Sequence, residues 1–112
     1  MVDPAELPET YRQIVTRFPK LAEAWDLTAA AGADGPLDER TRRLVKLGMA
    51  MAAMREGAVH SGVRKAVAAG ASRAEVEQLV VLVAGTIGFA GAAAVYTWVR
   101  DVLGEAPGPT AP

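Results

Sequence analysis

The fold is decided by residues 63–99, which read VRKAVAAGASRAEVEQLVVLVAGTIGFAGAAAVYTWV. Within this stretch, residues 78–99 carry no charged side chain, and Gly85, Gly88 and Gly91 interrupt the apolar run near its middle. An uncharged run of about twenty residues has the usual length of a membrane span. However, Leu, Ile and Phe are sparse in the second half, so insertion into a bilayer would be weakly driven. The stretch therefore predicts two buried helices with a glycine-rich joint, and we expect no membrane partner.

The other segments also show helical periodicity, and no run alternates as a half-buried strand would. Asp38 is a good N-cap for the segment that follows it, and Ser72 with Glu75 forms a capping-box pattern. These signals predict an all-α fold of about six helices. The expected helices span residues 9–17, 19–32, 39–54, 56–69, 72–85 and 89–103. The side chains expected to face inward from the first helix are Tyr11, Ile14, Val15 and Phe18.

The domain organisation is expected to be simple. A single helical domain is predicted over residues 8–103. The N-terminal residues 1–7 are expected to be loose, and their acids and prolines lack the basic and apolar regions of a signal peptide. Residues 104–112, which read GEAPGPTAP, form a Pro/Gly tail that is expected to be disordered.

Composition narrows the classes of function. The 112 residues have a net charge of −1, which argues against nucleic acid as a partner because nucleic acid selects a basic surface. The chain has no cysteine, so disulfides, zinc–cysteine sites and thiol redox chemistry are excluded. A cysteine-free chain also fits a reducing, cytoplasmic location. The uncharged helices of residues 78–99 hold more apolar surface than so small a monomer covers, so we expect a homo-oligomer.

The stretch from Leu37 to Leu103 resembles the carboxymuconolactone decarboxylase family, which includes the alkylhydroperoxidase D-like proteins. The resemblance rests on LDERTRRLVKLGMAMAA at residues 37–53 and on the stretch 63–99 quoted above, which are similar to the family in their order and spacing. It implies an all-helical fold and an obligate oligomer, commonly a trimer or hexamer. It also implies active sites near subunit contacts.

The departures from the family pattern limit the chemistry. Redox members carry a CxxC pair, a histidine four residues after the second cysteine, and a glutamate one helix earlier. The corresponding positions here hold Arg55, Ala58, Gly62 and Arg43. A thiol peroxidase mechanism is therefore excluded. Decarboxylase-type members also use a histidine at the place of Gly62, so that chemistry cannot be carried over. Residues 56–62, EGAVHSG, are similar to a cysteine-free branch of the family that reads EGAVHSH.

One pair of side chains in this segment suggests acid–base chemistry. Glu56 and His60 are four residues apart on one predicted helix, so they share a face and can reach each other. A catalytic reading makes His60 the general acid or base and Glu56 its orienting partner. The structural reading is favoured, because such pairs stabilise helices by about 0.2–0.5 kcal/mol without any catalytic role and no third member of a site is visible.

Two arginines are candidates for holding an anionic ligand. By the resemblance, Arg43 and Arg55 occupy positions that surround the redox centre in thiol members of the family. A guanidinium can donate two parallel hydrogen bonds to a carboxylate or phosphate. In the alternative reading they belong to a solvated charged face. No metal site is predicted, because the single histidine supplies too few ligands, and no cofactor is expected.

Two functions therefore remain open from the sequence. The first is a cofactor-free small-molecule enzyme, of lyase or isomerase type, that uses His60 as general acid or base. The second is a non-catalytic oligomeric binding or scaffold protein that keeps the fold without the active site.

Overall fold

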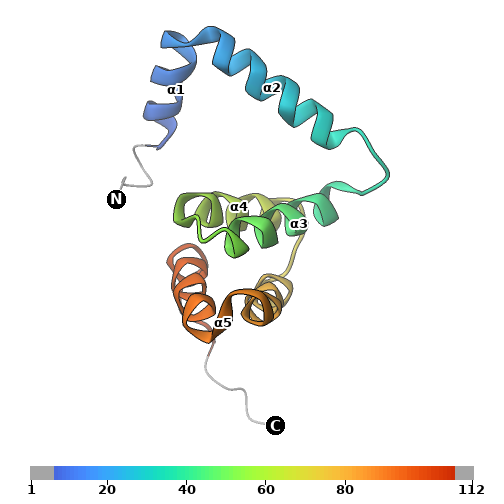
Figure 1. Cartoon of the computed structure of the whole chain (residues 1–112), viewed down its shortest axis with the longest axis vertical. Helices are drawn as coiled ribbons and strands as arrows, with labels where there is room; N and C mark the ends of the chain where they lie inside the picture. Colours follow the sequence, from blue (N-terminus) through green and yellow to red (C-terminus); the bar gives the residue numbers. More distant parts are fainter. Residues whose placement is uncertain (1–6, 108–112) are drawn as a thin grey trace. The chain divides into compact units, whose positions relative to one another are not determined.

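The structure is a computed structural model that describes residues 7–107, all of whose regular elements are α-helices (Figure 1). The all-α class is therefore confirmed. The five helices are α1 (Leu7–Arg17), α2 (Pro19–Ala33), α3 (Glu39–Ala52), α4 (Glu56–Ala68) and α5 (Arg73–Leu103). The chain divides into two compact units, Met1–Pro36 and Leu37–Pro112. Residues 1–6 and 108–112, which include most of the expected loose ends, lie outside the described residues. The single domain expected over residues 8–103 stays a prediction.

The first unit consists of α1 and α2, which pack against each other across a break at Pro19. Proline is favoured in the first turn of a helix because its missing N–H would have no partner there. Tyr11, Ile14 and Phe18, which were expected to face inward, are exposed. Tyr11 and Ile14 nevertheless line an apolar groove between α1 and α2. No residue of α2 is buried, and its Trp25 is 57% exposed. Two short helices have no further layer within their unit against which to bury an apolar face.

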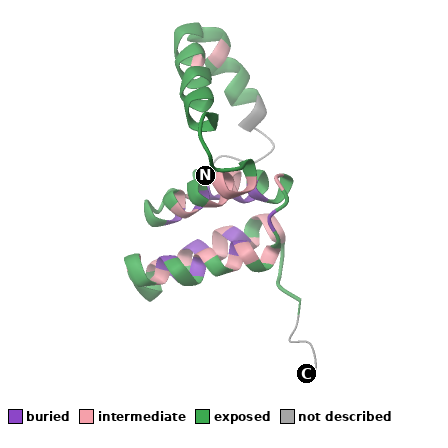
Figure 2. Ribbon diagram, turned by 90° about the vertical axis from the view of Figure 1, so that its right-hand side faces the viewer, coloured by how far each residue is buried: buried purple, intermediate pink, exposed green. Residues whose placement is uncertain are grey.

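The second unit holds the hydrophobic core, to which α3, α4 and α5 each contribute one apolar face (Figure 2). The fully buried side chains are Leu47, Met51, Val59, Val63, Ala66, Val76, Val95 and Val99. The expected end of the third helix at Met54 was wrong, because α3 stops at Ala52. Met54 has a positive φ of 55° and is exposed, so it belongs to the turn that leads into α4.

The two helices expected at residues 72–85 and 89–103 form one element, α5, that bends sharply at Gly88 (Figure 1). Gly88 has φ 87° and ψ 168°, and the predicted glycine-rich joint is confirmed at this residue. The guanidinium of Arg73, at the start of α5, donates hydrogen bonds to the carbonyl oxygens of Leu103 (3.1 Å) and Gly104 (2.7 Å) at its end. A straight helix of 31 residues would separate these ends by about 45 Å. The helix α5 is therefore folded back on itself.

The fold-back bears on the membrane question. By length and composition, Arg73–Leu103 is the one described helix that could cross a membrane. Each half of the bent helix is only about 22 Å long, whereas the hydrocarbon core of a bilayer is about 30 Å thick. The bent shape suits packing against α3 and α4 within the unit, and the expected lack of a membrane partner stays a prediction.

Both predicted N-caps are confirmed, and they fix where α3 and α5 begin. The Asp38 carboxylate accepts a hydrogen bond from the Thr41 N–H at 2.8 Å. The hydrogen bonds from Thr41, with a smaller effect from nearby arginine charges, lower the pKa of Asp38 below its usual value. Ser72 and Glu75 form a reciprocal capping box, with distances of 3.1 and 2.9 Å. These caps satisfy backbone N–H groups that would otherwise lack partners in the first turn of each helix.

Candidate functional site

The only histidine of the chain lies where α4 meets the second half of α5. His60 follows the fully buried Val59, and its side chain is 12% exposed. Its Nε2 atom lies 3.0 Å from Oδ2 of Asp101, two residues before the end of α5. The bend at Gly88 is what returns the second half of α5 to the core, where it packs with α4. The fold thus brings together two polar side chains 41 positions apart.

The chemistry of this pair follows from the donors and acceptors present. An ionised carboxylate can only accept hydrogen bonds, so Nε2 of His60 carries the hydrogen that is donated to Asp101. In a neutral imidazole the other nitrogen, Nδ1, then has a free lone pair. Among the described residues Nδ1 has no hydrogen-bond partner, and it is not a fully buried atom. An imidazole held in this way can accept or return a proton at Nδ1.

Glu56 was predicted to orient His60, and the structure gives His60 a different partner. Glu56 is half-buried in the first turn of α4, one turn before His60. No hydrogen bond or ion pair joins the two side chains within the described residues. Sequence reasoning missed Asp101, because only the register between α4 and the second half of α5 connects it to His60. The catalytic role of Glu56 stays a prediction.

The two arginines predicted to bind an anion make no polar contact with His60 in the described part of the chain. Arg43 is half-buried on α3, with Nε 3.9 Å from Oε1 of Glu39. Arg55 is exposed at the N-cap of α4, and its side chain makes no cap hydrogen bond. Neither arginine forms a hydrogen bond or ion pair with His60 in the described part of the chain. Their ligand-binding roles also stay predictions.

Comparison of the sequence with known families places this chain in one of them. The sequence model of the carboxymuconolactone decarboxylase family matches residues 19–101, which cover most of the chain. The chain belongs to the carboxymuconolactone decarboxylase family. The match begins at α2, and so extends the resemblance that the sequence showed from Leu37. A comparison with curated proteins found no match. This member of the family has no cysteine, so thiol chemistry is closed to it.

The place at which the resemblance implies a second histidine is a packing position in this carboxymuconolactone decarboxylase family member. A Cβ atom at Gly62 would lie 3.0 Å from Cδ1 of Leu47, which is fully buried. Such a contact is tight, so a larger side chain at residue 62 would force Leu47 to move. The glycine allows α4 to approach α3 closely. An acid–base site that uses a histidine in this chain is therefore built on His60, without a histidine at residue 62.

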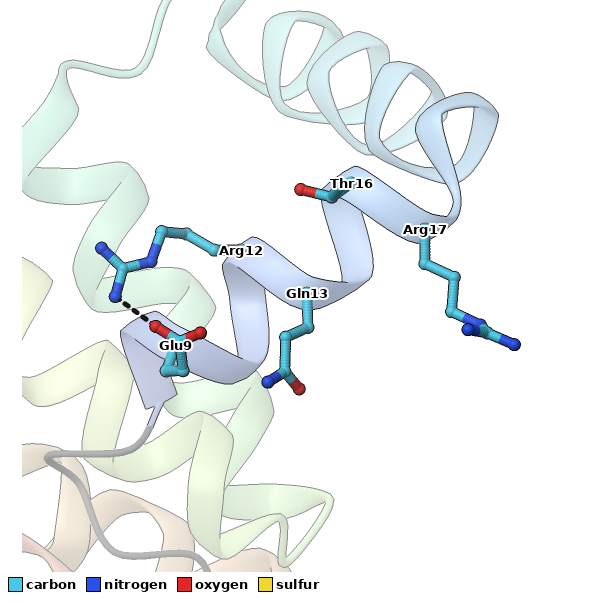
Figure 3. Close-up of a pocket in the computed structure, with 5 residues that line it drawn as sticks. All are labelled: Glu9, Arg12, Gln13, Thr16 and Arg17. Carbon is cyan, nitrogen blue, oxygen red and sulfur yellow. Dashed lines mark hydrogen bonds and ion pairs between the residues drawn. The ribbon is translucent and has the colours of Figure 1, made fainter.

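Two of the hollows on the surface lie away from His60 and Asp101, on α1 and between α3 and α5. One, of about 610 Å³, is lined by α1 alone, and Figure 3 shows its five side chains: Glu9, Arg12, Gln13, Thr16 and Arg17. Arg12 forms an ion pair with Glu9 there, and both side chains are well exposed (Figure 3). The other, of about 330 Å³, is an apolar groove between α3 and α5 whose lining includes Leu44, Leu79 and Leu82. One helix alone does not supply convergent polar groups, so the α1 hollow is not a candidate active site.

Proposed function

We propose that this carboxymuconolactone decarboxylase family member is a cofactor-independent acid–base enzyme that acts on a small molecule through His60. The observation that carries the proposal is the 3.0 Å hydrogen bond from Nε2 of His60 to Oδ2 of Asp101. Asp101 is the positioning residue, because its carboxylate holds the imidazole in one tautomer and one orientation. Nδ1 of His60 is then the atom that moves the proton.

The family name suggests the substrate class, which is an unsaturated lactone that carries a carboxylate. In the isomerase form of the reaction, Nδ1 removes a proton from a carbon next to a carbonyl group. The electron pair of the broken C–H bond is delocalised onto the carbonyl oxygen, and the imidazolium returns the proton to another carbon. In the lyase form, the bond to the carboxylate breaks and CO₂ leaves. The electrons stay on the substrate carbon, and His60, which in this form of the reaction enters as the imidazolium with a proton taken from water on Nδ1, gives that proton to the carbon.

The proposal is tested by following carbon-bound hydrogens in D₂O. The protein is incubated with a panel of carboxylated unsaturated γ-lactones, and ¹H NMR records deuterium incorporation, double-bond migration and loss of the carboxylate. We expect at least one compound to react faster than in a heat-denatured sample. If every compound reacts at the rate of the denatured control, the protein is not an enzyme for this substrate class, and the proposal fails.

The second candidate is a non-catalytic oligomeric scaffold, and the packing of Gly62 against Leu47 favours it. Residue 62 is the position at which decarboxylase-type members of the family carry a histidine. The contact supports the reading that in this chain it serves the close packing of α4 on α3 instead. The two candidates differ in what a substitution at His60 does. In a scaffold, His60→Gln changes only the packing around residue 60 and leaves assembly intact. In an enzyme, the same substitution removes turnover.

We also propose that the chain forms a homo-oligomer through the outer surface of α5. Val81 and Leu82 are exposed there, and Phe89, next to the bend, is 86% exposed. Large apolar side chains exposed in this way are typical of protein contact sites. We expect a second copy of the chain to cover these side chains. The groove that includes Leu79 and Leu82 offers that copy a concave surface.

Sedimentation equilibrium measures the oligomeric state directly. We expect a mass that is a multiple of 11.7 kDa at micromolar concentration, and a shift toward the monomer in Phe89→Glu. Arg17→Glu, which places an acid on exposed α1, is the control and is expected to leave the mass unchanged. A monomer at micromolar concentration in the parent protein would contradict the oligomer.

A further inference from the structure

Arg73, the first residue of α5, ties the two ends of that helix together. Its Nη1 atom donates a hydrogen bond to the carbonyl oxygen of Leu103 at 3.1 Å, and its Nη2 atom donates one to the carbonyl oxygen of Gly104 at 2.7 Å. We name these two hydrogen bonds the Arg73 clasp. Carbonyl groups at the end of an α-helix lack partners within the helix, and a cation is favoured there. The clasp therefore caps the end of α5 from its beginning, 30 residues earlier.

The guanidinium of Arg73 is itself held in place. Its Nε atom donates a hydrogen bond to Oε2 of Glu77 at 3.1 Å, one turn further along α5. The side chains of Arg73 and Glu77 are only 25% and 34% exposed, so solvent and salt weaken this ion pair less than a fully exposed one. Three of the five N–H donors of the guanidinium thus have partners, which fixes the direction in which its two Nη atoms point.

The Arg73 clasp holds the segment that carries Asp101. Leu103 lies two residues after Asp101, which is about 3 Å along the helix axis. Val99 is the last buried residue of α5, and the side chain of Asp101 is 54% exposed. Beyond Val99, the core is contacted by the partly buried Val102 and Leu103. Among the described residues, the clasp and the His60 contact are the polar ties from this last turn to distant parts of the chain.

A small displacement of this last turn is enough to break the contact with His60. The distance from Nε2 of His60 to Oδ2 of Asp101 is 3.0 Å, whereas N–H···O hydrogen bonds span only about 2.7–3.2 Å. Helix ends fray when nothing holds them. Fraying would turn the half-exposed carboxylate of Asp101 toward water, and the imidazole would lose the acceptor that fixes its tautomer and orientation.

We propose that Arg73 is a positioning residue for the acid–base site, because its clasp holds Asp101 within hydrogen-bond distance of His60. Arg73 acts through Asp101 and takes no part in the proton transfer itself. The effect on turnover rests on the proposed acid–base function, whereas the effect on the hydrogen bond between His60 and Asp101 does not.

The effect on the hydrogen bond is tested by NMR in Arg73→Gln, which removes the charge and the forked donors. We expect the Nε2 proton of His60 and the backbone amides of residues 100–103 to exchange with water at least about tenfold faster than in the parent protein. The matched control is Arg40→Gln, which removes a guanidinium that pairs with Glu75 near the start of α5 and leaves the end of the helix alone. In this control the Nε2 proton is expected to exchange as in the parent.

A second variant separates loss of the clasp from a general loss of stability. Arg73→Lys keeps the charge, but a single ammonium group cannot reproduce a planar fork that reaches two carbonyl oxygens. We expect an intermediate exchange rate of the Nε2 proton, with the amides of the buried Val59 and Val63 as protected as in the parent. The proposal fails if this proton exchanges in Arg73→Lys as in the parent, or if it is accelerated only by the same factor as those two amides.

The effect on turnover is tested by a double-mutant cycle with a lactone that reacts. Arg73→Gln is expected to lower kcat by about threefold to tenfold and to leave KM within about twofold, because Arg73 positions Asp101 and not the substrate. In Arg73→Gln/Asp101→Asn, kcat is expected to fall no further than in Asp101→Asn alone. An unchanged kcat in Arg73→Gln, or a loss that multiplies in the double variant, would overturn the proposal. If no lactone reacts, the acid–base function fails, and the NMR exchange rates still decide whether Arg73 holds Asp101.

Discussion

Replacement of Gly88 by alanine is expected to lower the free energy of unfolding by about 1–3 kcal/mol, because the residue lies in a backbone region that only glycine adopts without strain. Gly88 has φ 87° and ψ 168°, and this conformation folds α5 back on itself. No heavy atom surrounds the position where a Cβ would stand, so the cost arises from the backbone and not from a clash. Urea denaturation monitored by tryptophan fluorescence measures the change.

The neighbouring Gly85 is the matched control. It has helical backbone angles within α5, and a Cβ there would meet no atom within 4 Å. Gly85→Ala is therefore expected to raise the free energy of unfolding by about 0.5–1 kcal/mol. The two substitutions add the same methyl group three residues apart, yet their effects are expected to have opposite signs. Equal effects, or a neutral Gly88→Ala, would show that the bend does not need a glycine.

Substitution of His60 by glutamine is expected to reduce turnover by about 10²–10⁴-fold, which is the usual contribution of a general acid or base. Glutamine keeps a polar side chain of similar length but cannot take up a proton near neutral pH. The rate is measured by deuterium incorporation into whichever compound of the lactone panel reacts. His60 lies at the edge of the core and its Asp101 partner is 54% exposed, so the variant is expected to fold.

Two carboxylate variants then distinguish the possible partners of His60. Asp101→Asn is expected to lower kcat by about tenfold or more, because the amide no longer supplies a charged acceptor to Nε2. Glu56→Gln removes the same charge one turn away, and is expected to have the smaller effect. If kcat falls further in Glu56→Gln than in Asp101→Asn, the residue that orients His60 is Glu56, as their i,i+4 spacing alone suggests. Retained turnover in His60→Gln would remove His60 from the mechanism.

Local signals in the sequence were sufficient to predict much of the fold. The caps at Asp38 and Ser72 and the joint at Gly88 depend on neighbouring residues, so a pattern can reveal them. The end of α3 was predicted two residues too late, because Met54 continues the apolar periodicity although its φ is positive. The exposure of Phe18 and Tyr11 could not be predicted from α1, since amphipathic spacing shows which side chains share a face but not what covers it.

The candidate site could be predicted only in part, for a related reason. His60 stands out because it is the single histidine, and its i,i+4 spacing pointed to Glu56 as the partner. The contact with Asp101 depends on the fold-back of α5 and on the register of its second half against α4. Neither is a local property.

The hydrogen bond between His60 and Asp101 is tested most directly by NMR of the single imidazole. A hydrogen-bonded and sheltered ring N–H exchanges slowly enough with water to be detected, and with one histidine its assignment is unambiguous. We predict one such proton, attached to Nε2, in the parent protein and in Glu56→Gln, and its loss in Asp101→Ala. A protected proton on Nδ1, or an Nε2 proton that persists in Asp101→Ala and disappears in Glu56→Gln, would contradict the site described here.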